Sequence, residues 1–204
     1  MNDIVIPYIK NSSGELEACL ALINKNFPHR NIHVVEQHDR SPYRYASHID
    51  QIMKLKWAID NLDLTDDFYL FNDDFFVLNP VPETQYAHRG TLDEHIASRH
   101  SRDSYTRAII ETRDRLGSGL SYELHIPFLF NKEKLHNIIQ ELETSIEHRK
   151  CPLIRSYYGN TYDVGGECMD DVKNVKDFES KTYLSTTELS FKRQPIGEYI
   201  RSKI

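Results

Sequence analysis

The first third of the chain alternates short apolar runs with a segment whose apolar residues recur at helical spacing. Residues 3–7 and 31–36 predict two buried strands, and residues 15–24 between them predict a helix. A strand, a helix and a second strand within about 36 residues are typical of a parallel α/β unit with a right-handed crossover. A longer helical pattern at residues 47–61 and a dense β-forming run at residues 68–71 continue the alternation. We therefore expect an α/β fold whose mostly parallel central sheet is flanked by helices.

The rest of the chain is less regular. Apolar runs at residues 75–78 and 124–130 indicate further strands, and helical spacing recurs over residues 107–116 and 132–144. Residues 151–186 are rich in glycine and polar side chains, which favours loops with short strands. Because no linker-like or repetitive segment divides the chain, we expect a single domain.

The composition is ordinary for a globular protein. Hydrophobic residues make up 39% of the 204 positions and charged residues 27%, enough apolar material for one core across residues 1–204. The net charge of −6 argues against general affinity for nucleic acid. The sequence has no apolar run of about 18 residues, no recognisable signal peptide and no C-x-x-C pair among its three cysteines. We therefore expect no membrane span and a cytoplasmic location, where thiols stay reduced.

Two adjacent acids interrupt the most hydrophobic part of the sequence. Asn72, Asp73 and Asp74 lie between the apolar runs 68–71 and 75–78. Burying unpaired carboxylates costs several kcal/mol, and two neighbouring carboxylates also repel each other. A divalent cation bound by carboxylate oxygens would offset both costs, at the sheet edge where α/β proteins bind ligands. A solvated turn is the alternative, because Asn and Asp also favour turns.

The order of strand, helix, strand, Lys-bearing helix, apolar strand and acidic pair resembles that of nucleotide-sugar glycosyltransferases of the GT-A fold. More narrowly, the segment FNDDFF at residues 71–76 resembles the FNDD element of Stealth-type capsular polysaccharide sugar-phosphate transferases, and residues 125–127 are similar to their H-x-P region. The chain has IPYI at residues 6–9 instead of their TWVDG-like segment, which favours a glycosyltransferase. The resemblance is good over residues 3–82, moderate over residues 125–134 and poor elsewhere.

This resemblance implies a metal-dependent glycosyltransferase that moves a sugar from a nucleotide-sugar donor, expected to be a UDP-sugar, to a hydroxyl acceptor. Charge builds on the departing nucleoside diphosphate, and a divalent metal and cationic side chains stabilise it. Asp73 and Asp74 would hold Mn²⁺ or Mg²⁺, and Asn72 would position a sugar hydroxyl. Lys54 would contact the diphosphate or the sugar, unless it only belongs to a solvated helix face.

Other candidates lie near predicted strand ends. Tyr8 and Asn11 would line the base pocket, where Tyr8 stacks on the base or, alternatively, packs on the core. His125 would contact metal or phosphate or act as an acceptor-side base, because imidazole titrates near neutral pH; a buried structural histidine is the alternative. Two strand residues separated by one point to the same face, so we expect Glu123 and His125 to converge on one site.

A third polar cluster follows in the glycine-rich region. Arg155 would bind a phosphate with two hydrogen bonds, unless it forms a surface ion pair. Asp170 or Asp171 would be the base of an inverting transfer, in a loop that shapes the sugar pocket or is only part of the surface. Together with Glu123 and His125, these two aspartates complete the expected catalytic set.

Two basic segments keep DNA open as an acceptor. Residues 88–115 hold six arginines against five acids, and residues 192–204 hold four basic residues against one acid. Small phage enzymes that glycosylate hydroxymethylated DNA bases would need such a surface. The expected acceptor is therefore a saccharide or hydroxymethylated DNA. Two rival functions stay open: sugar-1-phosphate transfer in polysaccharide synthesis, and a carbohydrate- or nucleic-acid-binding module without turnover.

Overall fold

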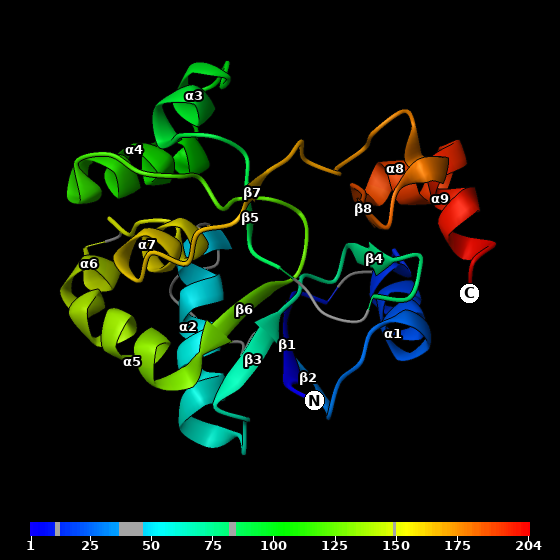
Figure 1. Ribbon diagram of the computed structural model, residues 1–204, viewed down its shortest axis with the longest axis horizontal. Coiled ribbons are helices and arrows are strands. Elements are labelled where there is room, and N and C mark those ends of the chain that lie inside the picture. Colours follow the sequence, from blue (N-terminus) through cyan, green and yellow to red (C-terminus); the bar gives the residue numbers. More distant parts are fainter. Residues whose placement is uncertain (11–12, 37–46, 82–84, 149) are drawn as a thin grey trace.

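The computed structural model describes residues 1–10, 13–36, 47–81, 85–148 and 150–204 (Figure 1). A four-stranded sheet with the strand order β2-β1-β3-β6 lies at its centre. Its strands are β1 (Asp3–Tyr8), β2 (Ile32–Glu36), β3 (Asp67–Leu70) and β6 (Phe128–Asn131). β1 pairs in parallel with β2 and β3, while β6 runs antiparallel to β3. The predicted α/β fold with a mostly parallel central sheet is therefore confirmed.

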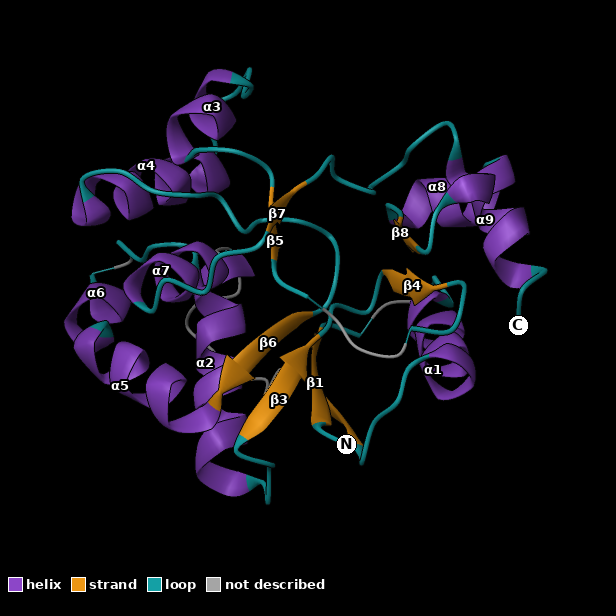
Figure 2. Ribbon diagram, in the orientation of Figure 1, coloured by secondary structure: helices purple, strands orange, loops and turns teal. Residues whose placement is uncertain are grey.

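Helices cover both faces of this sheet (Figure 2). α1 (Glu15–Asn26) packs on one face, and α2 (Ser47–Asn61) and α5 (Lys132–Glu141) pack on the other. The side chains of β1 alternate accordingly, because Ile4 and Ile6 pack with α1 whereas Val5 packs with α2. A strand that is covered on both faces needs apolar residues at successive positions, which explains the continuous apolar run in the sequence.

One lobe of the molecule is built from α3 (Leu92–Ala97), α4 (Ser104–Leu116) and α7 (Ile154–Thr161). α4 packs against both of the other helices. The sequence predicted α4 from residue 107, but the helix begins three residues earlier because the carboxylate of Asp103 caps it by accepting a hydrogen bond from the backbone N–H of Thr106 (2.8 Å).

The other lobe holds β4 (Phe75–Val77), β8 (Tyr183–Ser185), α8 (Glu188–Arg193) and α9 (Pro195–Arg201). β4 and β8 pair antiparallel, and this small sheet packs against α1 and the two C-terminal helices. Between the lobes a parallel pair of short strands joins β5 (Ala87–His88) to β7 (Glu167–Cys168). The chain therefore passes between the lobes over residues 169–182, after β7 and before β8.

Residues 151–186 contain the predicted short strands but also α7, which the sequence did not indicate. This helix is buried along most of its length, including Arg155 and Ser156, so it lacks the polar face that marks a surface helix. Gly159 is a packing residue rather than a loop residue, because a Cβ atom there would lie 2.5 Å from the ring of Tyr122. A further short 3₁₀ helix follows at Phe178–Ser180.

The stretch 124–130 is a strand only from Phe128 onward. Before it, the backbone bonds to side chains instead of to a neighbouring strand. The carbonyl of Leu124 accepts a hydrogen bond from Arg155, and the backbone N–H of His125 donates to Asp171. The argument that Glu123 and His125 share one face of a strand is therefore wrong, because both residues lie in a loop.

The helix predicted over residues 132–144 is interrupted. α5 ends at Glu141, and α6 (Glu143–Glu147) follows directly. In the described part of the chain, none of the helices has the length and apolar character needed to cross a bilayer.

Candidate active site

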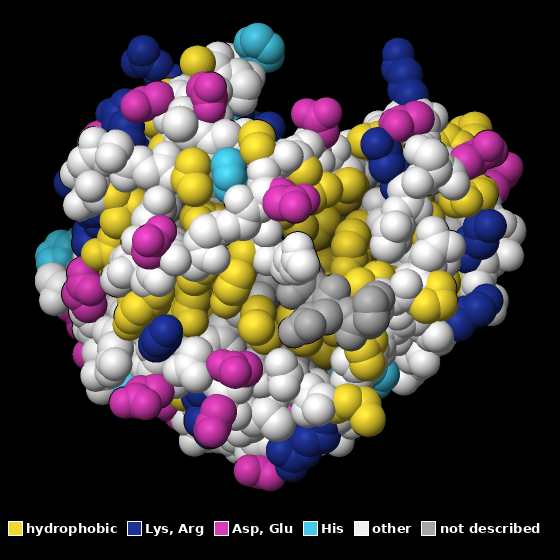
Figure 3. Space-filling view, viewed as in Figure 1, with side chains coloured by type: hydrophobic (Ala, Val, Ile, Leu, Met, Phe, Trp, Pro, Cys, Tyr) yellow, Lys and Arg dark blue, Asp and Glu magenta, His cyan; other side chains and the backbone are white. Residues whose placement is uncertain are grey.

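A cavity of about 630 Å³ lies at the carboxyl end of the parallel strands, between the two lobes. Figure 3 shows the outline of the molecule notched between these lobes. The wall of this main cavity comes from α2, the turn after β3, the α3–α4 lobe, the loop before β6, α7 and the segment after β7. These segments are far apart in the sequence, and the fold gathers them at the sheet edge where α/β proteins bind ligands.

A smaller cavity of about 300 Å³ adjoins the main cavity. Among the described residues, Ser47, Gln51 and Asn72 line both cavities. The smaller cavity also contains the end of β1 and the charged side chains of Asp50, Lys54 and Asp73. A ligand with two parts could therefore occupy both cavities across Asn72.

Asn72 lies at this junction, in the turn between β3 and β4. The backbone N–H of Phe75 donates to the carbonyl of Asn72 (3.2 Å), which closes the turn. Oδ1 of Asn72 accepts hydrogen bonds from Gln51 and Arg155, both at 3.3 Å. The Asn-Asp-Asp segment therefore lies in a turn between two strands, and its asparagine lines both cavities.

The two aspartates of this turn have different surroundings. Oδ2 of Asp74 accepts hydrogen bonds from Nζ of Lys173 (3.0 Å) and Oγ of Ser185 (2.9 Å), whereas Asp73 lines the smaller cavity. Among the described residues, no group of three or more His, Cys, Asp or Glu side chains is placed to hold a metal ion. Binding of Mn²⁺ or Mg²⁺ by Asp73 and Asp74 therefore stays a prediction.

His125 and Asp171 form a hydrogen-bonded pair in the wall of the main cavity. Nδ1 of His125 lies 2.9 and 2.8 Å from the two carboxylate oxygens of Asp171, and the backbone N–H of His125 donates to Oδ1 at 3.0 Å. When Nδ1–H donates to a carboxylate, Nε2 keeps its lone pair and can accept a proton. The sequence proposed both residues, and the structure brings them together as a potential base and its partner.

The environment of Asp171 keeps its carboxyl group ionised at neutral pH. Burial alone would raise its pKa, but the hydrogen bonds and charge of His125, with the backbone N–H of Val172, outweigh burial and lower the pKa of Asp171 to about 2. Nη1 of Arg89 also lies 3.8 Å from Oδ2 of Asp171. The carboxylate can therefore orient the imidazole of His125 and stabilise the imidazolium ion that forms when it takes up a proton.

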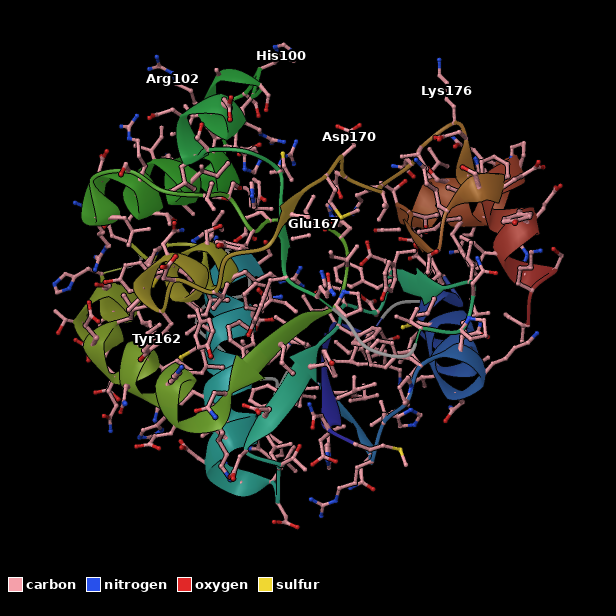
Figure 4. The ribbon with its side chains drawn as sticks, in the orientation of Figure 1. His100, Arg102, Tyr162, Glu167, Asp170 and Lys176 are labelled. Atoms are coloured by element: carbon pink, nitrogen blue, oxygen red, sulfur yellow. The ribbon has the colours of Figure 1, made fainter. Side chains whose placement is uncertain are left out.

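The other two acids that the sequence proposed as catalytic are placed differently. Glu123 lines the main cavity, and its Oε1 accepts hydrogen bonds from the backbone N–H (3.2 Å) and the hydroxyl (2.9 Å) of Ser156. Glu123 and His125 thus meet at one cavity, although not through a strand. Asp170 is exposed at the outer edge of its loop and lines neither of these cavities (Figure 4).

Arg155 is a buried cation in the main cavity, with 4% of its surface exposed. Its guanidinium donates to the carbonyls of Leu124 (2.6 Å) and Ile126 (3.4 Å) and to Oδ1 of Asn72 (3.3 Å). It also lies 5.2 Å from the centre of the Phe75 ring. The predicted alternative of a surface ion pair is therefore wrong.

The electrostatic position of Arg155 indicates an anion site. Burial lowers the pKa of its guanidinium, and the charges of Glu123, Asp74 and Asp171 oppose this effect. Within the described part of the chain, no carboxylate forms an ion pair with Arg155. An anionic ligand in the cavity would add the direct ion pair that the described carboxylates do not form with this buried cation.

The charge of the main cavity points the same way. Its described lining has four cationic and two acidic side chains: Arg89, Arg99, Arg155 and Lys173 against Glu123 and Asp171. Three of these cations also pair with an aspartate, and Arg155 is the cation of the described lining that forms no ion pair with a described acid. A cleft with an excess of one charge concentrates ligands of the opposite charge. The main cavity therefore suits an anion such as a diphosphate.

Two histidines that line the main cavity, His48 and His95, were not predicted as site residues from the sequence. Burial and the charges of Arg89 and Arg99 lower the pKa of His95 to about 4, so its ring is neutral. Burial also lowers the pKa of His48, whose Nδ1 is buried and has no hydrogen-bond partner among the described residues. A buried polar atom without a partner is available to form a hydrogen bond with a ligand. Nothing in the sequence distinguishes either histidine from an ordinary helix residue.

The residues proposed for the nucleotide lie around the smaller cavity. Nζ of Lys54 is buried and donates to Oδ2 of Asp50 (2.7 Å) and to the carbonyl of Tyr8 (2.8 Å), so Lys54 ties α2 to the end of β1. A solvated helix face is therefore wrong for Lys54. Tyr8 is buried and lines neither of the two cavities, and its stacking on a base stays a prediction. Asn11 lies outside the described residues.

Several arginines of the stretch 88–115 form ion pairs with neighbouring acids. Four of its arginines form ion pairs with described acids: Arg89 with Asp171 (3.8 Å), Arg99 with Asp103 (3.0 Å), Arg113 with Asp93 (3.1 Å) and Arg115 with Glu111 (2.7 Å). These pairs reduce the positive potential that phosphate groups would meet. Recognition of DNA by this surface stays a prediction.

Comparisons with known proteins place the fold. No family model matches the chain, and no curated protein matches its sequence. Among solved structures, the chain is similar to a glycosyltransferase involved in the glycosylation of the major capsid of PBCV-1. The TM-score is 0.52 at 11% sequence identity, and the match covers 98% of both chains.

A second solved structure is the apo-form glycosyltransferase GlyE of Streptococcus pneumoniae TIGR4. Its TM-score is 0.45 at 14% identity, covering 83% of this chain and 45% of that one, and such a score is too low to argue from. At 11% identity the first similarity establishes a common fold and no more. The protein therefore shares its fold with a glycosyltransferase.

Proposed function

We propose that the protein is a glycosyltransferase that moves a sugar from a nucleotide-sugar donor to a hydroxyl acceptor. The observation that carries this proposal is the His125–Asp171 pair in the same cavity as Arg155. A general base beside a buried cation is what a transfer to a hydroxyl with an anionic leaving group requires. The related fold belongs to a glycosyltransferase, which supports the proposal.

The donor would span the two cavities. Its diphosphate would lie in the main cavity near Arg155, because the lining there has an excess of positive charge. Its nucleoside, uridine in a UDP-sugar, would enter the smaller cavity at the end of β1 beside Asp73. Asn72, at the junction, would bind a hydroxyl of the transferred sugar or of the ribose.

The acceptor hydroxyl would give its proton to Nε2 of His125. Its oxygen then forms a bond to the anomeric carbon of the donor sugar, and the bond from that carbon to the diphosphate oxygen breaks. The electron pair of the broken bond stays on the departing nucleoside diphosphate, where cationic side chains stabilise it. Asp171 stabilises the imidazolium form of His125. One displacement at the anomeric carbon inverts its configuration.

The test measures products from a panel of UDP-, GDP- and dTDP-sugars with saccharide acceptors, with and without Mn²⁺. We expect release of a nucleoside diphosphate and an acceptor that is heavier by one sugar. A nucleoside monophosphate, with an acceptor heavier by a sugar phosphate, would contradict sugar transfer and support the sugar-1-phosphate alternative. Binding of donor without any product would support a module that lacks turnover.

The variant His125→Ala tests whether His125 acts in the transfer that this assay measures. We expect it to lower turnover about 100-fold or more, in the range typical of a positioned acid–base group, while the melting temperature still rises with donor. The matched control is His100→Ala, because His100 is an exposed histidine at the edge of the α3–α4 lobe (Figure 4). Full activity of His125→Ala would remove His125 from the mechanism.

A further inference from the structure

Lys173 lies where the sequence predicts a divalent metal. Its Nζ is 3.0 Å from Oδ2 of Asp74, and the hydroxyl of Ser185 donates to the same oxygen at 2.9 Å. Lys173 also lines the main cavity, which Arg155 lines as well. An ammonium group has three N–H donors, and the bond to Asp74 uses one of them. The remaining donors can therefore serve a ligand in the cavity.

The fold, rather than a flexible side chain alone, places this lysine. Lys173 forms an isolated parallel bridge with Ser185, and the backbone N–H of Asn174 donates to the carbonyl of Ser185 (2.9 Å). Ser185 is opposite Phe75 in the β4–β8 pair, and Phe75 directly follows Asp74. The pairing of β4 with β8 and the bridge from Lys173 to Ser185 thus hold Asp74, Lys173 and Ser185 in register.

The donor set around Asp74 fits a divalent metal poorly. Oδ2 of Asp74 already accepts two hydrogen bonds, one from a cation, so a metal ion at that oxygen would meet the positive charge of Lys173. Asp73 lines the smaller cavity instead. Magnesium is commonly held by one or two carboxylates together with waters and substrate phosphates, so the observation that counts against a metal here is the ion pair of Asp74 with Lys173.

We propose that Lys173, together with Arg155, supplies the positive charge that faces the donor diphosphate, and that the transfer needs no divalent metal. This inference rests on the proposed function and deepens it. Asp74 is then a positioning residue, because it holds the ammonium group at the cavity wall. Asp171, the partner of the base, lies two positions before Lys173. One short segment therefore carries both the residue that supports the base on the acceptor side and the cation that faces the diphosphate on the leaving-group side.

Inorganic pyrophosphate is a suitable probe, because it has the diphosphate chemistry without a base or a sugar. We expect isothermal titration calorimetry to detect its binding to the wild-type protein in EDTA. Lys173→Met should weaken this binding about tenfold or more, whereas Lys173→Arg, which keeps the charge, should stay within about threefold of wild type. Lys176→Met is the matched control, since Lys176 lies on the same segment but points outward (Figure 4), and it should bind like wild type.

Four results would overturn the inference. The first is pyrophosphate binding that requires Mn²⁺. The second is tight Mn²⁺ binding to the protein alone, seen as loss of the free-ion electron paramagnetic resonance signal and abolished in Asp74→Asn. The third is unchanged pyrophosphate binding in folded Lys173→Met, and the fourth is no binding of pyrophosphate under any condition. The wild-type measurements in EDTA decide the metal question even if a lysine variant does not fold.

Turnover separates this inference from the proposed function. If the sugar is transferred only when Mn²⁺ is present, the inference fails and the glycosyltransferase proposal stands. If wild-type protein transfers sugar in EDTA and Lys173→Met loses about 100-fold or more in turnover, both are supported. If no nucleotide sugar is consumed in EDTA or with Mn²⁺, the proposed function itself fails.

Discussion

Asp74 and Asp171 are two aspartates near the same cavity, and they differ in their partners. Asp74 accepts hydrogen bonds from an ammonium group and a hydroxyl, so its charge is paired with a permanent cation. Asp171 accepts a hydrogen bond from an imidazole, whose charge changes when it takes up a proton. The first arrangement fixes a positive charge in place, and the second prepares a base. The hydrogen-bond partner of a carboxylate, rather than the carboxylate itself, therefore decides what it contributes to the site.

Asp171→Asn should have the largest effect on activity. The amide cannot stabilise the imidazolium form of His125, so we expect turnover to fall about 100- to 1,000-fold with little change in donor binding. The pH profile of turnover should also change, because the variant lacks the carboxylate partner of the base. Steady-state kinetics between pH 5 and 9 measure both effects.

Asp74→Asn is the matched control for this experiment, because it removes the other aspartate without touching His125. It should weaken donor binding and leave the shape of the pH profile unchanged. If both variants shift the profile equally, the proposed difference between the two aspartates is wrong.

A smaller effect is expected in the stability of the protein. The pKa of Asp171 is about 2 in the folded chain, below its ordinary value of 3.8, so the folded state favours the ionised form. The stabilisation is therefore fully present above pH 3.8 and is lost as the pH falls through about 2. Its size is about 2 kcal/mol, since one pKa unit corresponds to about 1.4 kcal/mol.

Thermal unfolding of wild type and Asp171→Asn from pH 6 down to pH 3 tests this estimate. The difference between their melting temperatures should be constant down to about pH 4 and then narrow. A difference that stays constant to pH 3, or that widens, would show that the ionised carboxylate does not stabilise the folded state.

Much of the fold could be predicted from the sequence because its signals are local. The run at residues 4–7 is apolar throughout since β1 is covered on both faces, and the spacing in α2 follows from its single buried face. α7 could not be predicted, because its buried polar residues Arg155 and Ser156 conceal the helical pattern. Helix α7 is stabilised by its tertiary contacts, which a local sequence pattern cannot reveal.

The candidate site divides in the same way. Asn72, Asp73 and Asp74 stood out because acids inside an apolar run are unusual, and His125 stood out before a proline. No sequence pattern marks Lys173 as a site residue. It lies beside Asp74 because β4 pairs with β8, and this pairing is visible only in the structure. Likewise, the sequence could not select Asp171 over Asp170, because neighbouring residues in a loop point in directions that only the fold determines.

The anomeric configuration of the first product is the most direct test of the central claim, that His125 and Asp171 activate an acceptor for one displacement. Water can replace the unknown acceptor, so slow hydrolysis of an α-linked nucleotide sugar by wild-type protein can be followed by proton nuclear magnetic resonance before the free sugar equilibrates. The account predicts that the β-anomer is released first together with a nucleoside diphosphate. Initial release of the α-anomer, or of sugar phosphate, would contradict it.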